Sequence, residues 1–284
     1  MGKGARIILG VVATAALIAA AVIGIGRVMF ERRVDEEIES LLAANIVTAP
    51  AVVTEGDLAA LPEPVQRWLR WAQVVGKEYP ATVRLQQEGR FRQAEGESWM
   101  PFTAEEYFTT EPPAFVWKTR MQMFPLISIV GRDRFAGGKG SIEMRLLGSV
   151  PVADASGPRM DQGALLRYLN ETMWFPAAAL SPYITWEGVD ANSATATMSY
   201  AEVTASATFV FDARGRPVDM IAERQDLARG ELETWSTPML AYDEFQGVRV
   251  PSEGVGLWKY ESGDFPYIEL RITEIEYDQP AAYQ

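Results

Sequence analysis

The stretch RYLNETMWFPAAALSPYITW, residues 167–186, marks the point where a helix is expected to lead directly into strands. Asp161 lies just before it and predicts an N-cap, because a carboxylate accepts hydrogen bonds from the free N–H groups of a first helical turn. Pro176 and Pro182 prevent the helix from continuing. Apolar side chains recur at helical spacing at Leu165, Leu166, Leu169 and Met173.

Aromatic residues are more frequent at the end of this stretch than a surface loop requires. They are Trp174, Phe175, Tyr183 and Trp186. Large aromatic side chains gain much from burial. We therefore expect the helix and the turn after it to fill the concavity of a large sheet.

On both sides of the stretch the hydrophobic pattern has period two, which is typical of strands with one buried face. Turn residues such as Gly137-Gly138 separate these runs. A change of phase near Thr273-Glu274 predicts a bulge. About ten strands, two or three helices and no alternating β-α-β units predict a mainly β (α+β) fold. Its expected architecture is a large curved antiparallel sheet, half-barrel-like, packed around a central helix.

Small residues dominate the expected dry face of two adjacent strands. Ala196 and Met198 lie on one strand, and Ala205 and Ala207 lie on the next. Small side chains leave room above a sheet. Either the central helix or a ligand fills that room.

The hairpin around Gly137-Gly138 is rich in charge. It carries Arg132, Asp133, Arg134, Glu143 and Arg145. Facing opposite charges on a hairpin favour a cross-strand ion network on an exposed face. The alternative is a set of polar groups at the mouth of a cavity.

The N-terminal segment from Ile7 to Phe30 is apolar or small except for Arg27. About twenty apolar residues match the hydrocarbon thickness of a bilayer. A signal peptide cleaved near Ala19-Ala20-Ala21 is the alternative, but the apolar run continues past that point and favours an uncleaved anchor. Because the chain has no cysteine, lipoprotein processing is excluded.

We expect three parts: a transmembrane helix at 1–33, a stalk and linker at 34–56, and a β-rich domain at 57–284. Basic residues flank the apolar segment on both sides, so the positive-inside rule decides little. The N-terminal position of the segment favours a single-pass protein of the bacterial cytoplasmic membrane with its main domain extracytoplasmic. Residues 64–75 predict a short amphipathic helix that packs on the sheet edge, or else contacts a membrane surface or a partner.

The absence of histidine and cysteine excludes Ser-His-Asp and Cys-His catalysis, and the usual zinc and iron–sulfur sites. No calcium-loop pattern is present, and we expect no metal and no cofactor. Carboxylate pairs such as Glu274 with Glu276, Glu105 with Glu106 and Asp243 with Glu244 are typical of solvated strand faces. A glycosidase would need two carboxylates facing each other across a groove. We name no catalytic residue.

Net charge argues against nucleic acid as a partner. The chain has 26 basic and 38 acidic residues, and five basic and one acidic residue lie at or before Arg33. The remainder carries 21 basic against 37 acidic residues, a net charge of −16. Such a surface repels nucleic acid, and the charge otherwise indicates solubility.

Several sequence blocks resemble an uncharacterised bacterial membrane-anchored family, a domain of unknown function, over about residues 57–278. The blocks are LPEPVQRWL from Leu61, RLLG from Arg145, LRYLNETMWFP from Leu166, LSPYITW from Leu180, WSTP from Trp235 and ITEIEY from Ile272. The expected architecture is also weakly similar to the half-barrels of periplasmic lipoprotein carriers of the LolA and LppX type. That similarity implies a fold but assigns no function.

Eight tryptophans and eleven methionines indicate a bulky, adaptable interior. Core packing explains them, and so does an apolar cavity that accepts a lipid or acyl chain. On the second hypothesis the ligand-binding residues are Trp174, Phe175, Ala196, Met198, Ala205 and Ala207. The alternatives are a non-catalytic structural or interaction module of an envelope complex with an unknown protein partner, and, third, a carboxylate-based hydrolase.

Overall fold

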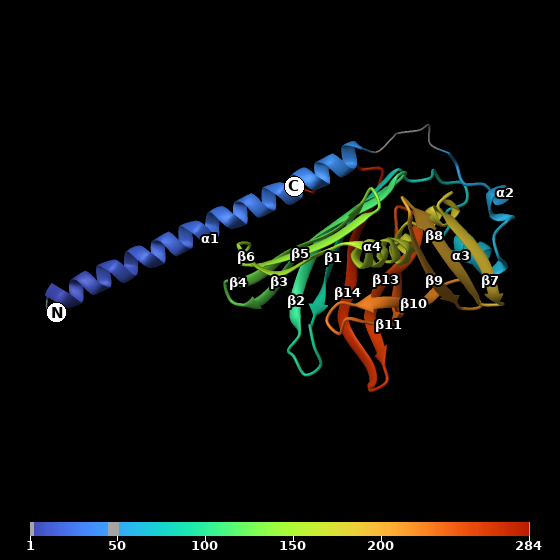
Figure 1. Ribbon diagram of the computed structural model, residues 1–284. Helices are drawn as coiled ribbons and strands as arrows, with labels where there is room; N and C mark the ends of the chain where they lie inside the picture. Colours follow the sequence, from blue (N-terminus) through green and yellow to red (C-terminus); the bar gives the residue numbers. More distant parts are fainter. Residues whose placement is uncertain (1–2, 45–50, 284) are drawn as a thin grey trace.

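A curled sheet of fourteen strands forms most of the protein (Figure 1). The computed structural model describes residues 3–44 and 51–283. Every strand pair is antiparallel, in the order β6-β5-β4-β3-β2-β1-β14-β13-β11-β10-β9-β8-β7, with β12 paired to β13. The strands are β1 Thr82–Phe91, β2 Met100–Thr110, β3 Pro113–Phe124, β4 Ile127–Ala136, β5 Lys139–Leu146, β6 Val150–Ser156, β7 Ile184–Asp190, β8 Ser193–Tyr200, β9 Val203–Phe211, β10 Pro217–Asp226, β11 Glu231–Ser236, β12 Met239–Phe245, β13 Val248–Tyr260 and β14 Gly263–Tyr277.

The expected fold class is confirmed, with more strands than the sequence indicated. The strands β6, β7 and β11 have weak sequence signals. Strand β6 is an edge strand with almost every residue exposed, so it has no buried phase to recognise. Strand β7 begins within the aromatic stretch, so its alternation does not stand out, and β11 has only six residues.

Two local predictions on the sheet are confirmed. Gly137 and Gly138 form the β4–β5 turn with φ of 59° and 75°, a left-handed conformation that glycine adopts without a steric penalty. The β1–β14 register shifts between Gln86 and Gln87, which pair with Glu274 and Ile272, so Thr273 is the bulged residue.

Helix α4, Pro158–Glu171, lies in the concavity of the sheet (Figure 1) and continues as two short 3₁₀ helices, η1 Thr172–Trp174 and η2 Pro176–Leu180. It contacts β3–β6 on one arm of the sheet and β8–β10 on the other. The expectation that Asp161 caps this helix is wrong, because the N-cap is Gly157. Asp161 instead accepts hydrogen bonds from the Gly140 amide at 2.8 Å and from Lys139 at 3.0 Å, which joins α4 to the β4–β5 turn.

The two arms of the sheet meet at their turns. A Cβ on Gly138 would lie 2.6 Å from the Cβ of Ala201, so the β4–β5 turn abuts the β8–β9 turn. Beside them the rings of Phe135 and Tyr200 stand 6.2 Å apart, edge to face. The β4–β5 and β8–β9 turns therefore bring the two halves of the curled sheet into contact beside α4.

Helix α3, Glu63–Trp71, follows the short helix α2, Glu55–Leu58. Its apolar stripe of Val65, Trp68, Leu69 and Ala72 is fully buried. The Trp68 ring lies 5.9 Å from that of Phe209 and 5.6 Å from that of Phe211, both on β9. The helix therefore packs on the sheet, which is the simpler of its two sequence interpretations.

Helix α1, Lys3–Ala43, is 41 residues long and has two different halves. An 18-residue window in the N-terminal part has mean hydropathy 2.2 and no buried residue, so this helix is long and apolar enough to cross a membrane. The C-terminal half, in the segment expected as a stalk, packs on the convex side of the sheet. There Val34, Ile38 and Leu42 are buried against Tyr107, Val116 and Val130. Residues 45–50 of the expected linker lie outside the described residues.

Candidate functional site in the concavity of the sheet

The six residues expected at a ligand site all belong to the main core cluster and are buried. Ala196 of β8 pairs with Ala207 of β9, and Met198 pairs with Ala205, so these four form one small-residue patch. Trp174 and Phe175 lie toward the other side of the concavity. The Phe175 ring is 4.9 Å from that of Phe108 on β2, and the Trp174 carbonyl accepts a 2.7 Å hydrogen bond from Tyr277 of β14.

Protein fills the room above the small-residue patch. Helix α4 covers β8 and β9, and the α3 side chain of Trp68 covers the neighbouring aromatics of β9. Of the two alternatives that the sequence left open at this place, the central helix occupies the patch in this conformation.

A buried charge cluster fastens α4 to the sheet, and sequence reasoning did not find it. The Arg167 guanidinium donates to Asp133 of β4 at 2.6 Å and to Glu106 of β2 at 2.7 Å. It also donates to Glu171, one turn further along α4, at 2.7 Å. We call Arg167, Glu106, Asp133 and Glu171 the Arg167 cluster. Two of its three charge-assisted hydrogen bonds tie the helix to β2 and β4, and the third lies within α4.

Neighbouring side chains surround this cluster closely. The guanidinium carbon of Arg167 lies 4.9 Å from the Trp117 ring centre and 5.0 Å from that of Phe115, within cation–π range. Gln87 links Glu106 to Trp117. Its side-chain amide nitrogen donates to Glu106 at 3.0 Å, and its side-chain oxygen accepts from the Trp117 indole at 3.0 Å. One cation therefore faces three carboxyl groups in an apolar surround.

The charge imbalance sets the protonation states in the cluster. Burial raises the pKa of Glu106 well above its ordinary value; Arg167 opposes this shift, and the nearby Glu171 and Asp133 add to it. Burial also raises the pKa of Glu171. Burial alone would lower the pKa of Arg167, but attraction to Glu106, Glu171 and Asp133 raises it, so the guanidinium stays charged. Glu106 is the group that holds a proton most readily.

The Arg167 cluster is built like a structural ion-pair cluster that holds α4 on the sheet, and unlike a solvent-accessible active site. Glu106 is completely buried, and Asp133 and Glu171 are nearly so. Glycoside hydrolysis needs carboxyl groups that face a groove. In the conformation described here, all three carboxyl groups instead face the same guanidinium beneath α4.

The expected hairpin ion network is divided between the two faces of the sheet. Asp133 points inward to Arg167, whereas Arg132 and Glu143 point outward to α1. Burial would raise the pKa of Glu143, but a hydrogen bond from Arg145 and the charges of Arg33 and Arg132 hold it below its ordinary value. Among the described residues no ion pair joins β4 to β5, so the expected cross-strand network is absent; the pair of Glu143 with Arg145 runs along β5 itself.

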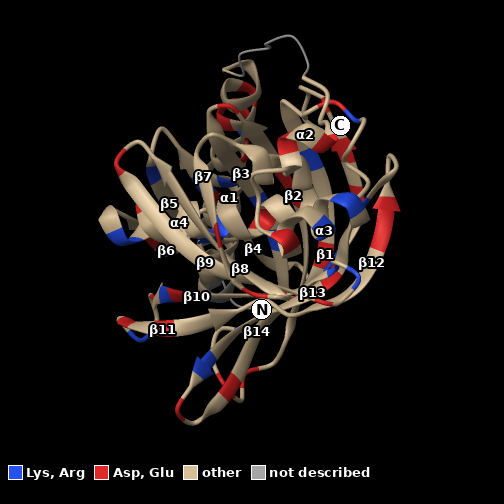
Figure 2. Ribbon diagram, turned by 90° about the vertical axis from the view of Figure 1, so that its right-hand side faces the viewer, with Lys and Arg blue, Asp and Glu red and all other residues tan. Residues whose placement is uncertain are grey.

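Two of the carboxylate pairs expected on solvated strand faces lie on outer surfaces, but the expectation is wrong for Glu106, which is buried. Glu274 and Glu276 face outward from β14, where Glu276 pairs with Arg84. Asp243 and Glu244 are exposed on β12, a strand that shows red, the colour of acidic residues, in Figure 2. Glu105 and Glu106 point to opposite faces, since Glu105 accepts from the outward Tyr107 hydroxyl at 2.7 Å. Among the residues that the structure describes, no group of three or more acidic side chains is placed to hold a metal ion.

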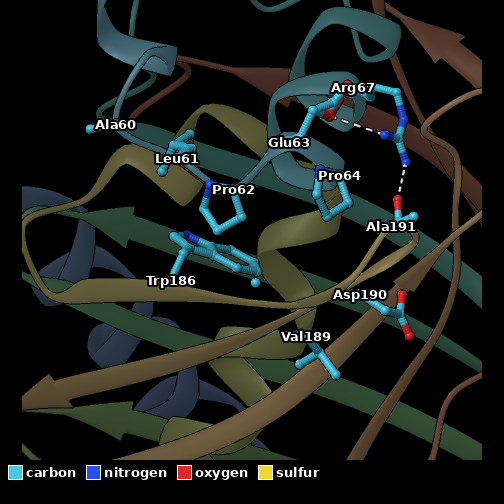
Figure 3. A pocket seen from close by; sticks show the side chains of 11 residues that line it. Ala60, Leu61, Pro62, Glu63, Pro64, Arg67, Trp186, Val189, Asp190 and Ala191 are labelled. Atoms are coloured by element: carbon cyan, nitrogen blue, oxygen red, sulfur yellow. Dashed lines mark hydrogen bonds and ion pairs between the residues drawn. The ribbon is translucent and has the colours of Figure 1, made fainter.

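Two surface cavities lie outside the concavity. One, of about 670 Å³, lies between the α3 N-terminus and the β7–β8 turn (Figure 3). Trp186 and Pro62 form its apolar floor, and Arg67 crosses its edge to donate to the Ala191 carbonyl at 2.6 Å. The second, of about 470 Å³, is a polar groove between Phe30 of α1 and the outer face of β1–β3.

A strip of apolar side chains continues the inward face beyond α4. Register places Phe91 opposite Ile268 and next to the Gly89–Leu270 pair, on the inward face of β1 and β14. On the other side of the concavity, Ile129 and Met144 flank the inward Gly131 of β4. Phe91, Ile129, Met144, Ile268 and Leu270 are only partly buried, and we call them the inner strip.

The fold and site define a class: a curled antiparallel half-barrel, filled by a fastened helix and preceded by a long apolar helix. The chain belongs to DUF6544, a family of unknown function, whose model matches residues 51–270. This confirms the family resemblance of the sequence blocks. No curated protein sequence matches the chain.

Three solved structures are similar in fold at low sequence identity. A DUF1329 family protein from Desulfovibrio piger ATCC 29098 has 9% identity and a TM-score of 0.47, over 77% of this chain and 93% of that one. A LolA superfamily protein from Nitrosomonas europaea has 11% sequence identity and a TM-score of 0.39, over 76% of this chain and 94% of that one. A beta-barrel-like DUF1849 protein from Brucella abortus has 9% sequence identity and a TM-score of 0.27, over 70% of this chain and 99% of that one. The second of these three proteins belongs to the LolA superfamily, which the sequence analysis names.

Proposed function

We propose that the protein is a membrane-anchored binding protein that holds an apolar ligand, a lipid or acyl chain, on the concave face of its sheet. The observation that carries the proposal is the inner strip. Its five apolar side chains face inward, continue the core and keep part of their surface exposed. Apolar surface that lines a concavity and stays exposed favours a ligand, because burying it against one gains free energy.

The six residues predicted from the sequence form the deeper part of this proposed site. The small-residue patch lies beneath α4, whereas Trp174 belongs to η1 and Phe175 to the junction between η1 and η2. A ligand that starts on the inner strip reaches them when α4 and η1 move away from the sheet. The Arg167 cluster is then the fastener that has to open.

Anchoring is the second part of the proposal. The N-terminal half of α1 crosses the bacterial cytoplasmic membrane once, and the β domain lies on the extracytoplasmic side. The length and hydropathy of α1 support the span. The N-terminal position of the apolar segment supports the orientation.

Native mass spectrometry of the full chain in detergent, followed by lipid extraction, tests the ligand. The expected result is an apolar molecule bound at near one-to-one ratio. The variant Ile268→Asp places a charge on the inner strip and should lose that molecule. The matched variant Val255→Asp places the same charge on the outer face of the adjacent strand and should keep it, because Val255 pairs with the outward Glu269. A clean apo mass of the wild type, with no thermal shift on adding lipid, would refute the proposal.

The second candidate is a non-catalytic interaction module, and the cavity in Figure 3 favours it. Leu61, Pro62 and Trp186 offer an apolar floor beside the exposed Val189 and the charged Arg67. A protein partner that inserts a small apolar side chain fits this chemistry. Cross-linking from a photoreactive amino acid at Val189 in cells would capture such a partner, whereas a pure ligand carrier would give no specific adduct.

A further inference from the structure

Exposed apolar side chains gather at the tips of two adjacent hairpins. At the β3–β4 turn, Leu126 is 96% exposed and Phe124 is 60% exposed, with Met123 and Ile127 beside them. On β6, Val150 and Val152 are each 52% exposed. We call these six residues the apolar rim. Exposed apolar groups in such a patch cost solubility unless something covers them.

The two tips form one continuous edge. Strand β4 starts where β5 ends, with Ile129 opposite Leu146. The Leu147 amide donates to the Ser128 carbonyl at 2.8 Å, which links the β5–β6 turn to the start of β4. Figure 1 shows this edge on the side of the domain that faces the N-terminal half of α1.

The apolar rim also adjoins the apolar span directly. The Ser149 hydroxyl of the β5–β6 turn donates to the Ile23 carbonyl of α1 at 2.8 Å. Gly148 and Gly26 allow close approach here, since added Cβ atoms would meet Arg27 and Ser149 at 2.8 and 2.3 Å. The turn therefore touches α1 between Ile23 and Arg27, close to the end of the exposed apolar run, which continues to Val28 and Met29.

The side chains just beyond that contact suit a membrane interface. Phe30 has the guanidinium groups of Arg33 and Arg145 within 5.3 and 5.6 Å of its ring. Arg27 and Arg120 both pair with Glu31 on the same level of the helix. Basic residues at the end of an apolar span are typical of the headgroup region, where long cations reach out to phosphate.

From this continuity we infer that the apolar rim inserts into the outer boundary of the same bilayer that α1 crosses, and so docks the edge of the half-barrel on lipid. A rigid contact at Ile23–Arg27 fixes the depth of the tips relative to the span. The rim would then lie at the boundary between headgroups and acyl chains. Docking there brings the sheet next to a source of apolar ligand, so this inference rests on the proposed anchor and deepens the proposed function.

Site-specific fluorescence tests the docking, because the chain has no native cysteine. The full chain is placed as one copy per nanodisc, with a polarity-sensitive dye on Leu126→Cys, and the lipids carry a quencher at a shallow acyl position. The expected result is a shift of the dye emission to shorter wavelength and loss of its intensity on adding quencher lipid. The same dye on Ser262→Cys, in the β13–β14 turn, should show neither change.

Two further variants separate the possible outcomes. With the dye on Val152→Cys, the double change Phe124→Asp and Leu126→Asp should abolish quenching. The matched change Leu227→Asp and Leu232→Asp, on the exposed leucines of the β10–β11 hairpin, should leave it intact. A dye on Leu17→Cys reports the span itself. If Leu17 is quenched and Leu126 is not, the docking inference is wrong while the anchor stands. If neither the Leu17 dye nor the Leu126 dye is quenched, the proposed anchor is wrong, and the docking inference is wrong with it. A blue-shifted dye on Leu126 without lipid quenching would point to protein contact instead and would also overturn the inference.

Discussion

At the scale of single residues, the placement of one arginine organises the site. Arg167 is the cation that compensates Glu106, Asp133 and Glu171 inside the concavity. Buried ionised groups are tolerated only when they are paired and hydrogen-bonded. The cluster therefore fixes where α4 lies, and its protonation links the position of the helix to pH.

A pH dependence follows from Glu106. Because burial raises its pKa in the folded state, folding favours the protonated form, and the stabilisation is complete below the unfolded pKa of about 4.5. It is lost as the pH rises through the higher folded value. We expect the free energy of unfolding of the wild type to fall relative to that of Glu106→Gln above about pH 5, by at most about 1.4 kcal/mol per pH unit. Urea unfolding in mild detergent at several pH values measures this. Parallel pH profiles for the two proteins would contradict it.

Removal of the cation should have a larger effect. Arg167→Met leaves three buried carboxyl groups without a positive partner, and breaking such a buried pair costs about 3–5 kcal/mol. The control is Arg216→Met, which removes a partly exposed pair with Asp212 and should cost less than about 1 kcal/mol. Equal losses of unfolding free energy in the two variants would mean that the Arg167 cluster does not fasten α4.

The Arg167 cluster could be predicted only in part from the sequence. Arg167 and Glu171 are four residues apart, which is also the pattern of a solvated pair on a helix surface. The usable signal was on β2, where Glu106 interrupts the inward series of Ala104 and Phe108. One carboxylate in an apolar phase indicates a buried partner, but no local pattern identifies which distant residue that partner is.

At the scale of elements, the packing of α1 on the sheet was not predicted for the same reason: no local pattern identifies a distant partner. The helical spacing of Val34 and Ile38 indicates that the helix continues into the segment expected as a stalk, and α1 does so. Its counterpart is made of outward residues from strands, among them Tyr107 and Val116, whose neighbours on that face are charged. The period-two pattern therefore assigns Tyr107 and Val116 to a solvent-exposed face of the sheet. By contrast, the small-residue rows, the glycine turn and the bulge are local signals, and the structure contains all three.

The contact between α1 and the sheet yields an element-scale prediction. Ile38→Ala removes a buried side chain from this contact and should lower the local opening free energy of the helix by about 2–5 kcal/mol, without unfolding the sheet core. Hydrogen exchange of the amides in residues 33–42 measures the change. Glu36→Ala, on the exposed side of the same turn, is the control and should leave exchange unchanged. Faster exchange throughout the β-sheet would show that α1 is part of the global folding unit instead.

At the scale of the whole molecule, three of the four ion pairs between the described residues of α1 and the sheet have their acidic partner on α1, and the exception is Arg33 with Glu143. Asp35 pairs with Lys118 at 2.6 Å, and Glu37 pairs with Arg132 at 2.9 Å. These pairs fix the rotation of α1 on the convex face and leave the concave face to the core and the inner strip. The apolar span, the apolar rim and the inner strip then follow one another from the proposed bilayer toward the proposed ligand site.

The orientation of this arrangement across the membrane has a direct test. Because we propose that the β domain lies outside the cytoplasm, a cysteine introduced by Ser262→Cys should react with a membrane-impermeant maleimide in intact spheroplasts. A cysteine introduced by Gly2→Cys should react only after the cells are lysed. The absence of native cysteine keeps the background low. The opposite labelling pattern would place the domain in the cytoplasm, and any ligand would then have to come from the inner leaflet.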